Sequence, residues 1–171
     1  MEWFVRTADG RTLAVEDAGD RAGRPVLVHV GTPNSRHLYG RTVADATARG
    51  LRLISYDRPG YGESTPQRGR ADLAFLTDEA ACMQQALAAG IEGSWDDCVA
   101  QVTPWGFDVA RISVPVLLLH GRQDTSVPVG HGEWLAAHIP GVDARLLDNE
   151  GHGTLRENRI GEVQAWLTER S

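Results

Sequence analysis

An acidic residue and a histidine follow two strand-like segments in the C-terminal part of the sequence. Asp124 comes shortly after the apolar run Val116–Leu119, and His152 lies in a Gly-His-Gly loop after Ala144–Asp148. A carboxylate that accepts a hydrogen bond from an imidazole fixes the tautomer of the ring and stabilises its protonated form. An imidazole held in this way can act as a general base. Asp124 and His152 are therefore the candidate catalytic pair.

Two parallel strands would bring these side chains together. Val116–Leu119 is a continuous apolar run, which is typical of a strand buried on both faces in a parallel sheet. Ala144–Asp148 is a second strand-like segment about thirty residues further on. Because ligands of parallel sheets bind at the carboxyl ends of strands, we expect Asp124 and His152 to meet at one edge of the sheet.

The rest of the chain alternates between strand and helix patterns. Asp9-Gly10 between two β-prone segments predicts a hairpin. Ser94 and Asp97 have the spacing of a capping box at a helix start. Strands are expected at Trp3–Arg6, Thr12–Glu16, Pro25–Val30 and Leu51–Tyr56, and Pro25–Val30 is of the same buried type as Val116–Leu119. Helices are expected around Tyr39–Ala46, Leu73–Leu87, Val99–Val102, Trp134–His138 and Ile160–Leu167. This alternation predicts an α/β domain with a mostly parallel sheet and an N-terminal antiparallel hairpin.

The composition excludes several classes of function. The chain of 171 residues has a net charge of −6, which disfavours nucleic-acid binding. All 17 basic residues are arginine, so a phosphate loop or Schiff base that needs lysine is excluded. Cys82 and Cys98 are expected to be free thiols, and the histidines show no metal-ligand spacing, so neither a metal nor a cofactor is expected. We see no signal peptide and no membrane-spanning run, and expect a cytoplasmic protein.

Four motifs resemble the α/β-hydrolase fold family, and together they cover nearly the whole chain. They are His29-Val30-Gly31-Thr32-Pro33, Asp57-Arg58-Pro59-Gly60-Tyr61-Gly62-Glu63-Ser64, Leu119-His120-Gly121-Arg122-Gln123-Asp124-Thr125-Ser126-Val127-Pro128 and Glu150-Gly151-His152-Gly153. The resemblance implies a three-layer sandwich in which Asp124 is the triad acid and His152 the catalytic histidine. It also implies that backbone amides near Gly31 and Thr32 donate to an oxyanion. Asp57 and Arg58 are expected to hold their loop.

The sequence departs from this family at the nucleophile. A G-x-S-x-G elbow should stand between the second and third motifs, and no such pentapeptide occurs. We interpret the chain as a single domain, 1–171, shortened by an internal deletion: 1–70 and 110–171 are the halves of the core, and 71–109 is a residual cap. The nucleophile is unknown, because none of the candidates lies on a strand-to-helix elbow. These candidates are Ser35, Ser64, Cys82, Ser94 and Ser126, and water activated by the pair is a further option.

Two arrangements can close the gap left by the missing strands. In the first, Val116–Leu119 takes the vacant place beside Val26–Val30, with the helix Leu73–Leu87 as a right-handed crossover. In the second, another copy of the chain completes the sheet, because an unpaired apolar strand edge promotes association. We expect a homodimer.

Two functions remain open at this point. The first is weak hydrolysis of small-molecule esters or acyl compounds by His152 and Asp124. The alternative is a catalytically inactive hydrolase remnant that serves as a dimerisation or small-ligand binding module.

Overall fold

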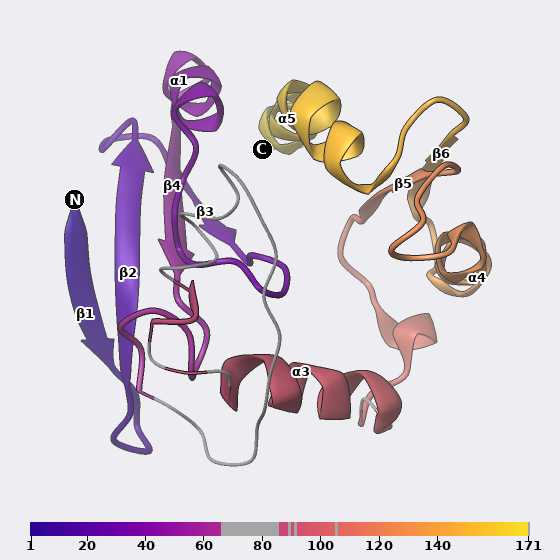
Figure 1. The fold of residues 1–171 in the computed structure, drawn as a ribbon. Coiled ribbons are helices and arrows are strands. Elements are labelled where there is room, and N and C mark those ends of the chain that lie inside the picture. Colours follow the sequence, from indigo (N-terminus) through magenta and orange to yellow (C-terminus); the bar gives the residue numbers. More distant parts are fainter. Residues whose placement is uncertain (66–85, 89, 91, 105, 171) are drawn as a thin grey trace. The chain divides into compact units, whose positions relative to one another are not determined.

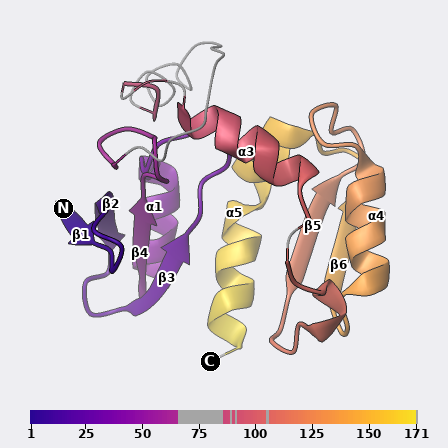
Figure 2. The same ribbon diagram turned by 90° about the horizontal axis from the view of Figure 1, so that it is seen from below.

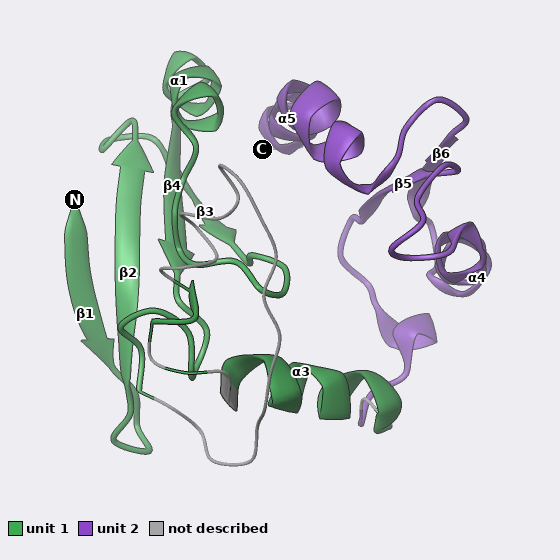
Figure 3. Cartoon of the chain, viewed as in Figure 1, with its two compact units in different colours: residues 1–104 green, residues 105–171 purple. Residues whose placement is uncertain are grey.

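The computed structural model describes residues 1–65, 86–88, 90, 92–104 and 106–170. The chain divides into two compact units, Met1–Pro104 and Trp105–Ser171, which are described separately (Figure 3). The single-domain organisation and the three-layer sandwich inferred from the sequence remain predictions.

Unit 1 contains a four-stranded mixed sheet (Figure 1). The strands β1 (Glu2–Arg6), β2 (Thr12–Gly19), β4 (Leu51–Tyr56) and β3 (Arg24–Val28) follow one another in that order across the sheet. The pairs β1–β2 and β2–β4 are antiparallel, whereas β3–β4 is parallel. The predicted hairpin is confirmed, and Gly10 in its turn has a φ of +86°, a conformation that favours glycine.

One helix covers one face of this sheet. Helix α1 (Gly40–Ala48) packs against alternate residues of β3 and β4, because successive side chains of a strand point to opposite faces. The buried cluster consists of Leu38, Ala46, Leu51 and Leu53, with Val26, Val28 and Val43 packed against it. Gly50, at a φ of +64°, follows the helix and lets the chain turn into β4, as the sequence predicted.

The expectation that Val26–Val30 is buried on both faces is wrong. Val26 and Val28 pack on the α1 side, but Leu27 points to the other face and is 58% exposed. β3 is an edge strand that pairs only with β4 among the described strands. Because successive side chains of a strand point to opposite faces of the sheet, Leu27 lies on the face away from α1 and is exposed there.

Helix α3 (Glu92–Val102) closes unit 1. The capping box is wrong, because the helix already begins at Glu92 and Ser94 lies inside it. Competing contacts explain the difference: the Ser94 and Asp97 side chains bond to Tyr61 and other residues of the core loops. Residues 73–85 of the predicted helix 73–87, which include Cys82, lie outside the described residues.

Unit 2 is a strand-helix-strand-helix unit. After the short 3-10 helix η1 (Val109–Arg111) come β5 (Leu117–Gly121), α4 (Val129–His138), β6 (Asp143–Leu147) and α5 (His152–Glu169). β5 and β6 are parallel, and α4 and α5 flank them on opposite faces (Figure 2). The strands and helices expected here are confirmed.

β5 and β6 form the parallel pair of unit 2. The predicted pairing of Val116–Leu119 beside Val26–Val30 would join unit 2 to unit 1, and it remains a prediction. Two of the four described strand pairs are parallel, and a mostly parallel sheet is not confirmed. Leu117–Leu119 are half-buried rather than fully buried, which follows from pairing on one side only.

Candidate active site

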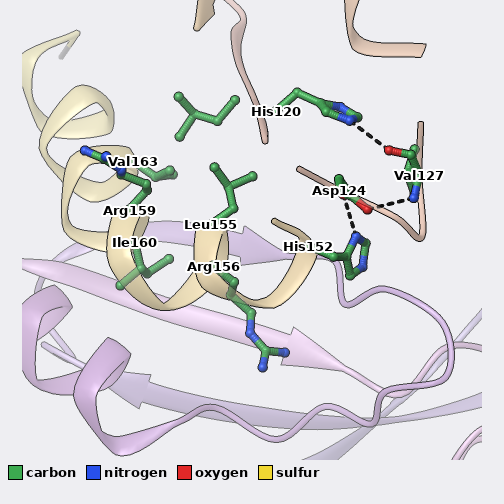
Figure 4. A pocket seen from close by; sticks show the side chains of 10 residues that line it. His120, Asp124, Val127, His152, Leu155, Arg156, Arg159, Ile160 and Val163 are labelled. Atoms are coloured by element: carbon green, nitrogen blue, oxygen red, sulfur yellow. Dashed lines mark hydrogen bonds and ion pairs between the residues drawn. The ribbon is translucent and has the colours of Figure 1, made fainter. Parts of the chain in front are cut away.

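The two catalytic candidates meet at the carboxyl ends of β5 and β6. Asp124 follows β5 by three residues, and His152 is the first residue of α5 rather than a loop residue. His152 Nδ1 lies 2.8 Å from Asp124 Oδ2 (Figure 4). The carboxylate side chain is only 6% exposed, whereas the imidazole is 61% exposed. The contact expected from the sequence is therefore present in unit 2.

Backbone hydrogen bonds hold the carboxylate in place. Asp124 Oδ1 accepts from the backbone N–H groups of Ser126 and Val127, each at 2.8 Å. Burial pushes the pKa of Asp124 upward, but the N–H of Val127, the bond to His152 and the N–H of Ser126 outweigh it and lower the pKa below its ordinary value. The carboxylate thus stays ionised at neutral pH, and Nδ1 of His152 is the donor. Nε2 then carries the lone pair that can accept a proton.

A pocket of about 380 Å³ lies beside the imidazole (Figure 4). His120 is part of its wall, and its Nε2 lies 3.0 Å from the carbonyl oxygen of Val127. The apolar part of the lining comes from β5, the loop after it and one side of α5, namely Leu119, Val127, Leu155, Ile160 and Val163. Arg156 and Arg159 of α5 also line the pocket. An apolar wall beside a small set of polar groups is the usual form of a small-molecule site.

Glu150 anchors the loop that leads to His152. Its side chain is buried and bonds to Arg159 Nε at 2.9 Å and Asn158 Nδ2 at 3.2 Å, both on α5. The loop passes so close to β5 that a Cβ at Gly121 would lie 2.2 Å from the carbonyl oxygen of Glu150. This role of Glu150 was not predicted from the sequence. A charged residue directly before the Gly-His-Gly loop was the available signal.

The residues expected to bind an oxyanion belong to unit 1. Gly31 and Thr32 lie in the exposed loop after β3, so the structure does not describe them together with the Asp124–His152 pair. The hydroxyl group of Thr32 contacts Asp97 and accepts a 3.0 Å hydrogen bond from Arg58 Nη2. Thr32 is thus tied to α3 through its side chain, which the sequence did not predict.

The described nucleophile candidates have different surroundings. Ser64 Oγ donates to the Asp57 carbonyl oxygen at 2.6 Å and accepts from the Ala14 N–H at 2.9 Å, so this hydroxyl is used in the core. Ser94 contacts Tyr61, and Ser35 is completely buried. Ser126 is the exposed candidate, two residues from Asp124. Burial thus argues against three of the four serines as nucleophiles.

Asp57 holds its loop, as expected. Its Oδ1 accepts from the backbone N–H of Arg36 at 2.6 Å and its Oδ2 from that of Glu63 at 3.1 Å. The Arg36 guanidinium, buried to 3% exposure, forms an ion pair with the same carboxylate, which is fully buried. This buried pair joins the loops after β3 and β4, and no pattern in the sequence points to Arg36.

Within the described ranges, no group of three or more His, Cys, Asp or Glu side chains is placed to hold a metal ion. Over the same residues, no helix has the length and apolar character needed to cross a membrane.

Comparison with known proteins identifies related enzymes. No family model matches the chain. It is 36% identical over 81 residues to the non-heme chloroperoxidase of Streptomyces lividans, which covers 43% of this chain and 29% of that protein. The fold is similar to an esterase from Exiguobacterium antarcticum, with a TM-score of 0.78, 15% identity and coverage of 99% and 100% of the two chains. A bromoperoxidase from Bacillus anthracis gives a TM-score of 0.73 at 16% identity, with both chains covered completely.

These similarities, together with the mixed α/β architecture, define the class of protein. The chain has the α/β-hydrolase fold, and segments of it are 31–36% identical to curated members of that fold family. The named relatives are esterases, haloperoxidases and other hydrolases of that family. The matched segments span less than a third of the first curated relatives.

Proposed function

We propose that the chain is a weak hydrolase of small esters or related acyl compounds, and that Asp124 and His152 carry out the proton transfers. One observation carries this proposal: a buried, ionised Asp124 holds an exposed His152 imidazole beside an apolar pocket. Esterases among the relatives and the structural neighbours support the substrate class.

The proposed reaction uses water in place of an elbow serine. His152 Nε2 takes a proton from a water molecule as the oxygen attacks the ester carbonyl carbon, and Asp124 stabilises the imidazolium. The tetrahedral intermediate collapses, the C–O bond to the alcohol breaks, and the imidazolium returns the proton to the leaving oxygen. The products are an acid and an alcohol, and His152 ends neutral.

The expected rate is low. Hydrolases that lose their nucleophile retain about 10³–10⁴-fold acceleration over water from the remaining site. The internal deletion is part of this proposal, since it accounts for the absent G-x-S-x-G sequence.

Turnover of p-nitrophenyl acetate by the wild-type chain and by His152→Ala tests the proposal. We expect the variant to fall to the buffer rate, while His131→Ala, which changes an exposed histidine of α4, keeps the wild-type rate. Equal rates for wild type and His152→Ala would exclude catalysis by this pair. Labelling of Ser126 by a fluorophosphonate would show that this serine, rather than water, is the nucleophile.

A binding module without catalysis is the second candidate. The open edge of β3 and the 58% exposure of Leu27 favour it, because an unpaired apolar strand promotes association between copies. The molar mass in solution, measured by light scattering, tests the expected homodimer, and a monomer at micromolar concentration would argue against it.

A further inference from the structure

The carboxylate of Asp97, on α3, has several hydrogen-bond donors around one of its oxygen atoms. Asp97 of α3 directs Oδ2 toward three groups of the loops after β3 and β4. The Tyr61 hydroxyl donates at 3.0 Å and Arg58 Nη1 at 2.5 Å, and Thr32 Oγ1 makes a short contact. Charge-assisted hydrogen bonds of this kind are stronger than neutral ones. Asp97 is therefore bound much as a ligand carboxylate would be.

Contacts other than those with Asp97 hold the side chains of Tyr61 and Arg58 in position. Tyr61 is fully buried, and α3 passes so close to it that a Cβ at Gly93 would lie 2.5 Å from Tyr61 Cε2. The Arg58 guanidinium lies 4.5 Å from the centre of the Tyr61 ring, a cation–π distance. These contacts orient the phenol and the guanidinium toward one point.

The single proton of the Tyr61 hydroxyl group is donated to Asp97. The Tyr61 oxygen lies 3.2 Å from Ser94 Oγ and 3.0 Å from Asp97 Oδ2. An ionised carboxylate has no proton, whereas a serine hydroxyl can donate, so Ser94 donates to Tyr61 and Tyr61 donates to Asp97. Burial raises the pKa of Asp97, but the bond to Thr32 and the charge of Arg58 outweigh it, so the pKa lies below its ordinary value.

We propose that Thr32, Arg58 and Tyr61 form a carboxylate-binding site, that Asp97 occupies this site, and that a small monocarboxylate competes with Asp97 for it. The site lies entirely within unit 1, so it does not depend on the function proposed for Asp124 and His152. A bound monocarboxylate would release the polar anchor that joins α3 to the loops after β3 and β4.

The charge balance selects this class of ligand. Arg58 supplies one positive charge, and Thr32 and Tyr61 supply neutral hydroxyl groups. One negative charge on a planar group matches this set. A dianionic phosphate would bring a second charge that Arg58 does not balance, and a neutral alcohol or amide would lose the charge-assisted bonds.

Thermal unfolding of the full chain in sodium acetate and in sodium chloride, at equal concentration and pH 7, tests the proposal. Asp97→Ala removes the internal carboxylate and vacates the site. We expect acetate at about ten times its dissociation constant to raise the midpoint of Asp97→Ala by about 3–4 °C relative to chloride. Wild type is expected to show a much smaller difference, because Asp97 competes. Asp45→Ala is the matched control, since Asp45 pairs with Arg49 at 2.9 Å on the surface of α1.

Two outcomes would overturn the proposal: no acetate effect on Asp97→Ala, or the same effect on Asp97→Ala, Asp45→Ala and wild type. If Asp97→Ala does not fold, Asp97→Ser keeps a polar group, removes the charge and shortens the side chain so that the site is still vacated. Acetate must then stabilise Asp97→Ser more than Asp45→Ser, and equal shifts reject the site. Arg58→Ala introduced into the responding variant is expected to abolish the acetate effect, and an unchanged effect would place acetate elsewhere.

Discussion

Each compact unit contains a buried aspartate that links separate segments, but the partners of the two residues differ in exposure. In unit 1, Asp57 pairs with Arg36, and both side chains are 3% exposed or less. In unit 2, Asp124 is 6% exposed, whereas its partner His152 is 61% exposed. The same residue type therefore pairs with an enclosed guanidinium in one unit and with a solvent-exposed imidazole in the other.

This difference separates a structural carboxylate from a candidate catalytic one. Asp57 accepts from two backbone N–H groups and the Arg36 guanidinium, all inside the protein. Asp124 accepts from two backbone N–H groups as well, but its third donor is an imidazole whose other nitrogen can exchange a proton with a substrate or water. Both aspartates are buried, so what distinguishes the two sites is that Arg36 is buried and His152 is exposed.

The largest expected effect is on the buried pair. Asp57→Ala removes the fully buried partner of Arg36 and leaves the guanidinium with only the exposed carboxylates of Glu2 and Glu63, and breaking a buried pair costs about 3–5 kcal/mol. Urea unfolding followed by circular dichroism measures this loss of free energy of unfolding. Asp45→Ala, which removes an exposed i,i+4 pair, is expected to cost about 0.3–0.5 kcal/mol. Similar losses for the two variants would contradict the comparison.

An intermediate effect is expected at Asp124, and it depends on pH. The folded pKa of Asp124 lies below the unfolded value of about 3.9, so ionised Asp124 stabilises the fold above that pH, and this stabilisation is lost as pH falls through the folded pKa. At pH 7, Asp124→Ala is expected to cost about 1–3 kcal/mol, because two N–H groups lose their acceptor. The difference between wild type and variant should shrink below about pH 4. A constant difference down to pH 2 would show that ionisation of Asp124 contributes no stability.

The smallest effect on stability is expected at His152. Because the ring is 61% exposed, His152→Ala should change the free energy of unfolding by about 0.5 kcal/mol or less, even if it abolishes ester turnover. Denaturant unfolding at pH 7 checks this. A loss as large as that for Asp57→Ala would make the Asp124–His152 pair structural, like the pair in unit 1.

Local patterns in the sequence were sufficient for most elements. The hairpin around Gly10, the strand Leu51–Tyr56 and the helix that Gly50 follows agree with their predicted positions. Their signals are short-range, because turn residues and side-chain periodicity depend on the local backbone. The contact between Asp124 and His152 was also predictable, since both follow parallel strands that pair with each other.

The predictions that failed depended on distant partners. The burial of Leu27 depends on which strands and helices lie against its face of the sheet. The capping box failed because Asp97 has stronger partners, Arg58 and Tyr61, more than thirty residues away. No periodicity within the sequence reports such contacts.

The sequence by itself determined the fold family, the order of the elements and the identity of the acid–histidine pair, because these depend on local patterns and motifs. Only the tertiary structure decided which carboxylates are enclosed and which face solvent. It paired Arg36 with Asp57 and Asp97 with Arg58, because burial and ion pairing depend on residues that folding brings together from distant parts of the chain.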